Sequence, residues 1–273
     1  MTVCIAAINH THKLIAFATE RMVTATSPPI EFEHSVGKLT QLNQYCVALP
    51  AGDAIRGKEI FDSVRGTVEK ANPPIPQIAE QVKEMYQRKR LQILEALHLR
   101  SRGINHQAFI EAGAKLLPPN IYAQIDYALA TFDLQVEAIV AGVDESGASV
   151  YGIRNPGLIS CFNSIGFHAI GTGGMHALIS LIETYAPEAG PAHTLYSAFR
   201  AKKVAEVTPG VGAETDLGII SIRQKIKYFH KNTELFKSLN ELYEKEKKAR
   251  KDLINRSEID KLSIEDRAEE VVE

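Results

Sequence analysis

Short apolar runs and amphipathic stretches follow one another along the first 222 residues of the chain. Runs rich in Val, Ile and small apolar residues, bounded by turn-forming residues, predict β-strands. Such strands are expected at residues 3–8, 14–19, 38–42, 45–49, 136–143, 149–153, 157–162 and 217–222. Apolar residues at helical spacing predict helices, the first of them with Asp53 as its N-cap. These helices are expected at residues 55–71, 76–99, 121–132, 175–185 and 192–205, whereas the pattern of residues 101–119 is less regular.

The order of these elements favours one fold class. Strands, helices, strands, helices and strands come in groups instead of alternating one by one. Grouped strands favour antiparallel sheets, and the helices then pack on the outer faces of those sheets. We therefore expect an α+β fold built of layers.

The composition changes at residue 223. The last 51 residues contain 13 Lys and Arg, 12 Asp and Glu, and neither Gly nor Pro. Leu235, Leu239 and Leu242 form an apolar stripe at helical spacing on this charged segment. We expect a main domain at residues 1–222 and a charged helical appendage at residues 223–273, either packed on the main domain or used in self-association.

Composition and charge exclude several function classes. The chain is 45% hydrophobic and 23% charged, as in ordinary globular proteins, and its net charge of −2 favours neither nucleic acid nor an anionic membrane as partner. No apolar run approaches the roughly 20 residues that cross a bilayer, and the N-terminus does not resemble a signal peptide. Three scattered cysteines form no CxxC pair. We expect a cytoplasmic protein.

Two clusters resemble ligand sites but are better explained structurally. His10 and His12 lie in a polar turn without a third ligand nearby, so we expect no metal site. The glycine-rich turn at residues 171–174 has neither the spacing of a dinucleotide fingerprint nor a P-loop lysine. Close packing at a helix N-terminus explains these glycines, and no cofactor is expected.

Thr2 has attractive chemistry for its position. If Met1 is removed, the hydroxyl and a free α-amino group, whose pKa is about 8, belong to one residue. Such a residue can act as nucleophile and base together. The alternative is that position 2 simply holds a small residue behind the initiator methionine.

Several short motifs in fixed order resemble a proteasome β-type subunit. They are TVCIA at residues 2–6, IAFATER at 15–21, GKL at 37–39, AG at 51–52, IVAGVD at 139–144, VYGI at 150–153 and AIGTG at 169–173. The resemblance covers residues 2–222 and leaves the charged tail without a counterpart. It implies the N-terminal-nucleophile hydrolase fold, a four-layer αββα sandwich of two antiparallel sheets between helical layers. That fold agrees with the layered architecture expected above.

The resemblance also implies roles for individual residues. Thr2 matches the nucleophile, Lys38 the catalytic lysine, and Gly52 the glycine whose N–H forms the oxyanion hole. Thr172 matches a serine that active members usually carry near the nucleophile. Pro50 and Ala54 are implied to border the pocket that receives the substrate side chain.

Two positions depart from the family pattern. The aspartate that follows the second strand in the family aligns with Thr19, and the nearest carboxylate is Glu20. The Asp-x-x-Ser-Gly motif near the last helix is replaced by TPGVG at residues 208–212, with Glu206 and Asp216 nearby but not at the family spacing.

Two hypotheses follow. The first is a threonine-type amidohydrolase, most simply a peptidase acting on peptides or proteins. The second is a catalytically inactive member of the same fold with a structural, assembly or regulatory role, motivated by the residues at positions 19 and 208. The resemblance implies self-association, with a ring as one arrangement.

Overall fold

The computed structural model describes residues 2–26, 29–34 and 37–255, and the chain divides into two compact units, Met1–Phe229 and His230–Glu273. The strands of the first unit are β1 Cys4–Asn9, β2 Leu14–Glu20, β3 Met22–Thr26, β4 Pro29–Glu33, β5 Thr40–Asn43, β6 Cys46–Gly52, β7 Val136–Asp144, β8 Gly147–Arg154, β9 Leu158–Cys161, β10 Phe167–Ile170, β11 Thr215–Ser221 and β12 Lys225–Phe229. Its helices are α1 Ala54–Ala71, α2 Ile75–Leu94, α3 His106–Leu116, α4 Pro119–Thr131, α5 Gly174–Thr184 and α6 Pro191–Ala205.

Two five-stranded antiparallel sheets form the centre of the first unit. One has the strand order β10-β1-β2-β11-β12, and the other has the order β5-β6-β7-β8-β9. In the first sheet Cys4 pairs with Thr19 on one side and with Ile170 on the other. Strand β1 therefore lies inside the sheet, which explains why it is apolar and buried throughout.

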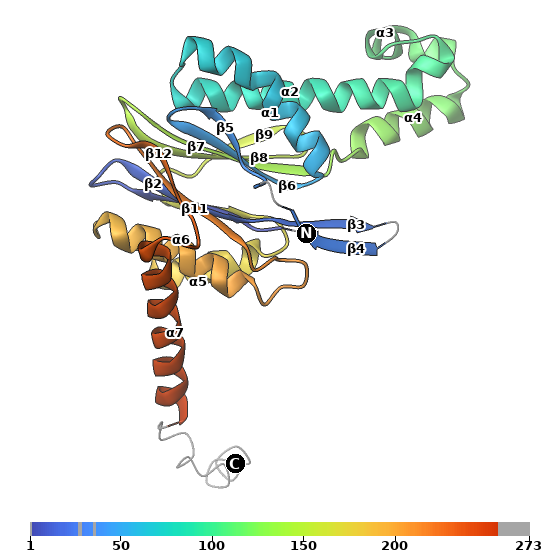
Figure 1. The fold of residues 1–273 in the computed structure, drawn as a ribbon. Coiled ribbons are helices and arrows are strands. Elements are labelled where there is room, and N and C mark those ends of the chain that lie inside the picture. The colour runs from blue at the N-terminus through green and yellow to red at the C-terminus, as the bar shows by residue number, and fades with distance from the viewer. Residues whose placement is uncertain (1, 27–28, 35–36, 256–273) are drawn as a thin grey trace, which may run out of the picture. The chain divides into compact units, whose positions relative to one another are not determined.

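Helices cover the outer face of each sheet. Helices α1 and α2 pack on the β5–β9 sheet, and α6 packs on β1 and β2, with α5 beside it (Figure 1). The inner faces of the two sheets share one apolar cluster that includes Phe17 and Ile15 from the first sheet and Leu49 and Ile139 from the second. The expected α+β class with antiparallel sheets is confirmed.

The predicted helix at residues 55–71 is present as α1, and its N-cap is the expected one. The Asp53 carboxylate accepts hydrogen bonds from the backbone N–H groups of Ile55 and Arg56. The helix predicted at residues 76–99 is α-helical to Leu94 and continues as a wider π-helical turn at Glu95–Leu99, followed by a 3-10 turn at Arg100–Arg102.

Helix α3 occupies the stretch in which the pattern was less regular. It packs with α4 around a small separate cluster of Leu99, Phe109 and Ile125, beyond the edge of the sheet (Figure 1). The hairpin β3–β4 was not expected either, because Pro29 lies at its turn and prolines usually end strands.

The first unit extends beyond the expected boundary at residue 222. Strand β12 pairs with β11, with Leu217 opposite Phe229, and so completes the edge of the first sheet. In β12, Lys225, Lys227 and Phe229 alternate with Ile226 and Tyr228. The two lysines make this strand resemble the charged tail, to which it was assigned from the sequence. The second unit contains helix α7, Glu234–Asn255. Within the described residues, no helix combines the length and apolarity needed to cross a membrane.

Candidate active site

The backbone of Thr2 is held against the turn that precedes α5. The N–H of Gly173 donates to the Thr2 carbonyl at 3.1 Å. Gly171 has a φ of +87°, and a Cβ built on it would lie 2.4 Å from the same carbonyl oxygen. Only glycine fits here, so the glycine-rich turn serves close packing against Thr2, as its spacing indicated.

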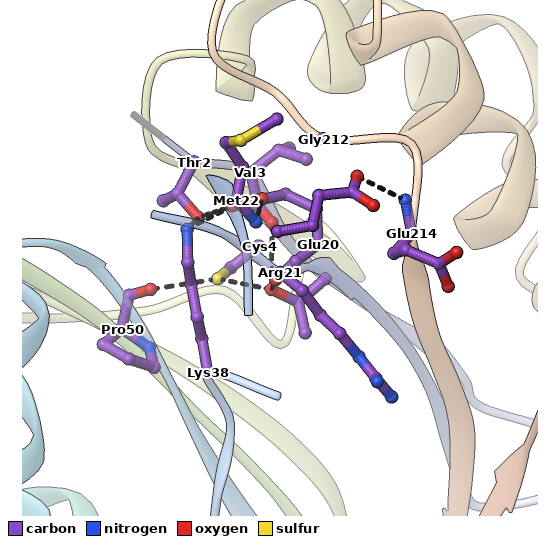
Figure 2. Close-up of polar contacts among 12 residues, drawn as sticks. Thr2, Val3, Cys4, Glu20, Arg21, Met22, Lys38, Pro50, Gly212 and Glu214 are labelled. Atoms are coloured by element: carbon purple, nitrogen blue, oxygen red, sulfur yellow. Dashed lines mark hydrogen bonds and ion pairs between the residues drawn. The ribbon is translucent and has the colours of Figure 1, made fainter. Parts of the chain in front are cut away.

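The side chains of Thr2, Glu20 and Lys38 meet in one hydrogen-bonded cluster (Figure 2). The Lys38 ammonium donates to Thr2 Oγ1 at 2.8 Å and also to Glu20 Oε1. The Thr2 hydroxyl donates to that same carboxylate oxygen, while Glu20 Oε2 accepts from the backbone N–H of Met22. The three side chains come from three separate segments of the chain.

Burial makes this cluster electrostatically strong. Thr2 is 3% exposed, and the side chains of Glu20 and Lys38 are 0% and 11% exposed. A buried carboxylate is tolerated only when a counter-ion and hydrogen-bond donors replace its water. Lys38, the Thr2 hydroxyl and one backbone amide supply those partners to Glu20. The Thr2 hydroxyl is thereby held between an acceptor and a cation.

Thr19 lies outside this cluster. Its hydroxyl donates to the Val3 carbonyl at 3.1 Å and lies 3.2 Å from the sulfur of Cys4. It therefore braces β1 against β2 and does not contact Lys38. The carboxylate that reaches the lysine belongs to the next residue, Glu20, which is the alternative that the sequence offered.

Gly52 and Thr172 both line a cavity of about 630 Å³ that Gly171 also borders. Gly52 has a φ of +91°, and a Cβ on it would lie 2.1 Å from the Gln135 carbonyl oxygen. The conformation at this position therefore requires glycine. Thr172 is exposed at the cavity wall, one residue after the glycine that touches Thr2.

The two residues expected at a substrate pocket, Pro50 and Ala54, do not line this cavity. Pro50 is buried in β6, where its carbonyl accepts from Cys4 at 3.2 Å and its ring faces Gly57 of α1. Ala54 is exposed at the first position of α1. Among the described residues that line the 630 Å³ cavity, neither appears.

The buried Lys202, which was not predicted from the sequence, holds the loop that packs against Glu20. Lys202 of α6 is fully buried, and its ammonium donates to the carbonyls of Gly212 and Ala213 at 2.9 and 2.8 Å and to Glu206. Burial lowers the pKa of Lys202, and the Glu206 carboxylate opposes this shift. A Cβ on Gly212 would lie 3.3 Å from Glu20 Oε2, so Lys202 holds the loop on which Glu20 rests.

A signal for Lys202 was present in the sequence. It falls on the apolar face of the predicted helix at residues 192–205, four residues after Ala198 and three before Ala205, both fully buried. A lysine on such a face needs buried partners. Glu206 and the carbonyls of Gly212 and Ala213, all after the end of this helix, are its partners.

Asp216 has a role away from Thr2. Its carboxylate accepts from Arg21 Nε at 3.0 and 3.1 Å, and this contact raises the pKa of Arg21. A Cβ on Gly37 would lie 2.3 Å from Asp216 Oδ2. The Arg21–Asp216 pair thus fixes the segment that immediately precedes Lys38.

Other groups near Thr2 do not compete with it as nucleophile. Burial raises the pKa of Cys4 to about 12, so its thiol stays neutral at physiological pH.

Within the described part of the chain, no group of three His, Cys, Asp or Glu side chains is arranged to hold a metal ion.

Neither the models of known protein families nor the curated proteins gave a match to this chain.

Proposed function

We propose that this chain is an N-terminal-nucleophile amidohydrolase similar to proteasome β-type subunits, most simply a peptidase, in which Thr2 becomes the first residue after removal of Met1. One observation carries the proposal: Thr2 Oγ1 accepts from Lys38 at 2.8 Å and donates to the buried carboxylate of Glu20. The two sheets with helices on their outer faces support the four-layer sandwich that belongs to this proposal.

The mechanism assigns one task to each group. Thr2 Oγ attacks the carbonyl carbon of the substrate, and its proton passes to the α-amino group of the same residue. Lys38 stabilises the negative charge that develops on the attacking oxygen, and Glu20 holds Lys38 in place. The Gly52 N–H is the proposed donor to the oxyanion, an interaction of about 3 kcal/mol in enzymes where it has been removed.

The reaction then proceeds through an ester on Thr2. The C–N bond of the substrate breaks, the amine leaves with the proton from the α-amino group, and the acyl group remains on Thr2 Oγ. Water attacks this ester, the acid is released, and the hydroxyl regains its proton. An amine in place of water would make the same site a transferase.

The second candidate is an inactive member with a structural or regulatory role. Thr19, at the position of the family's aspartate, supports it because its hydroxyl bonds to the Val3 carbonyl and not to Lys38. For both candidates we propose self-association, with a ring as one arrangement, and a cytoplasmic location.

Intact mass and a labelling experiment separate the two candidates. The purified protein is expected to lack Met1 and to gain the mass of one β-lactone electrophile bound through Thr2. Thr2→Val removes the hydroxyl at nearly constant volume and is expected to abolish labelling, whereas Thr2→Ser retains it. Thr11→Val, in an exposed turn, is the matched control. Retained Met1, or equal labelling of the Thr2→Val variant, contradicts the hydrolase.

A further inference from the structure

The 630 Å³ cavity borders the proposed nucleophile on one side. Gly171, in its wall, packs directly against Thr2, and Gly52, also in its wall, is the proposed oxyanion donor. A group attached to a carbonyl that lies between Gly52 and Thr2 can therefore extend into this cavity. Most of its other lining residues are polar or charged, and these residues determine which ligand group fits.

Arg154, the last residue of β8, is exposed in the wall of this cavity. Within the described residues, no ion pair joins it to Asp133 or Glu137, the two acids that share the cavity. Asp133 instead accepts from the N–H of Gln135 at 2.7 Å, and Glu137 from the N–H of Gly171 at 3.4 Å. The guanidinium therefore offers its donors to a ligand, and a carboxylate is the anion that its planar fork matches.

The same cavity also suits an amine. The carboxylates of Asp133 and Glu137 belong to residues of its wall, and a carboxylate accepts hydrogen bonds from an ammonium group. With two carboxylates and one guanidinium in the wall, a zwitterion fits the charges better than a dianion such as phosphate.

A second cavity, of about 510 Å³, shares Glu137, Arg154 and Gly171 with the first. Its other walls include the apolar side chains of Phe162, Ile170, Met175 and Leu178. Arg154 thus lies where the two cavities adjoin, beside the apolar side chains that form part of the wall of the second. A ligand with a carboxylate next to an apolar side chain places each part in a matching environment.

We infer that Arg154 binds the α-carboxylate of the leaving group, so that the site releases a single apolar amino acid from the C-terminal end of an acyl or peptidyl chain. The inference rests on the proposed function. In the step concerned, the Thr2 Oγ–acyl bond forms, the amide C–N bond breaks, and the departing nitrogen takes the proton, which leaves the free amino acid beside Arg154. Water later releases the acyl group.

Binding of the product tests this assignment without any turnover. L-Leucine and L-leucinamide, which differ in the carboxylate, are titrated calorimetrically into the full chain. Leucine is expected to bind at least about tenfold more tightly than leucinamide, the effect of one charge-assisted hydrogen bond. Arg154→Met is expected to remove this difference in affinity, and Arg154→Lys is expected to retain part of it. The control variant Arg102→Met, in the 3-10 turn before α3, is expected to leave the difference unchanged. Equal affinities in the wild type overturn the inference.

Turnover separates failure of the inference from failure of the proposed function. N-acetylated pentapeptide pools with a free or an amidated C-terminus are incubated with the protein, and the products are identified by mass spectrometry. The expected result is release of single apolar residues from the free-acid pool only, with a higher KM in Arg154→Met. Equal internal cleavage of both pools sustains the hydrolase and overturns the role of Arg154. If neither pool is cut, the hydrolase fails, and the leucine titration alone decides whether Arg154 binds a carboxylate.

Discussion

The ion pair between Glu20 and Lys38 makes a quantitative prediction about stability. Both side chains are nearly or fully buried, so removing one partner leaves a charge without its counter-ion in a medium of low dielectric. Such a loss costs about 3 kcal/mol or more. We therefore expect Glu20→Gln and Lys38→Met each to lower the free energy of unfolding by about 3 kcal/mol.

The double variant is the informative one. Glu20→Gln combined with Lys38→Met leaves no charge unpaired, so its cost is expected to be no larger than that of either single variant and well below the sum of about 6 kcal/mol. The coupling energy is then about 3 kcal/mol or more, and each single variant lowers Tm by roughly 6–12 °C for a unit of this size. Urea unfolding followed by circular dichroism measures all four corners of the cycle.

An exposed ion pair provides the control for this cycle. Arg65 and Glu69 pair on the surface of α1 with side chains 49% and 47% exposed. Their double-mutant cycle is expected to give less than about 0.5 kcal/mol. If the Glu20–Lys38 cycle is equally small, the buried pair is not electrostatically coupled, and the argument that Glu20 holds Lys38 fails.

Three further predictions concern single positions. Gly52→Ala is expected to destabilise the protein by about 1–3 kcal/mol, because Gly52 has a positive φ and an added Cβ would meet the Gln135 carbonyl. The control is Gly66→Ala in helix α1, where a Cβ has open space and is expected to stabilise the protein by up to about 1 kcal/mol. Thermal unfolding compares the two variants. Burial lowers the pKa of His168 from 6.5 to about 4, so the folded state favours the neutral ring. The contribution of His168 to the free energy of unfolding is therefore complete above pH 6.5 and is lost as the pH falls from 6.5 to 4. A His168→Gln variant whose stability falls equally over this range contradicts the prediction. Lys202→Met removes the donor shared by the Gly212 and Ala213 carbonyls and Glu206, and it is expected to cost about 3 kcal/mol and to slow turnover. An unchanged urea midpoint would show that the loop does not need this lysine.

Much of the fold was predictable because local signals and burial agree. The runs at residues 3–8 and 14–19 became the hairpin β1–β2, and Asp53 caps α1 as its side chain and position indicated. Helix α3 was missed because only two of its residues, Phe109 and Gly113, are buried, which leaves no clear apolar stripe. Strand β12 was missed because its charged edge residues resemble the tail that follows.

The site was predictable only in part. Lys38 was found through the motif that surrounds it, and Gly52 through its spacing from Lys38. The choice between Thr19 and Glu20 could not be made from the pattern, because the pairing of β1 with β2 ends at Cys4 and Thr19. Beyond that pair the two strands no longer fix each other's side chains, and only the folded chain places the Glu20 carboxylate beside Thr2.

The electrostatic balance of the cluster explains why three distant segments have to come together. The Glu20 side chain is fully buried, and burying its charge without Lys38 would cost too much free energy. The position of Lys38 in turn depends on the preceding segment, which the Arg21–Asp216 pair fixes. On the other side, the loop against Glu20 is held by Lys202, whose own charge is balanced by neighbouring acceptors. Because the Thr2 hydroxyl lies between the carboxylate and the ammonium, it is oriented by both before any substrate arrives. A nucleophile that is oriented in this way loses little entropy on reaching its reactive position, so the proposed attack depends on the packing of the first sheet as much as on Thr2 itself.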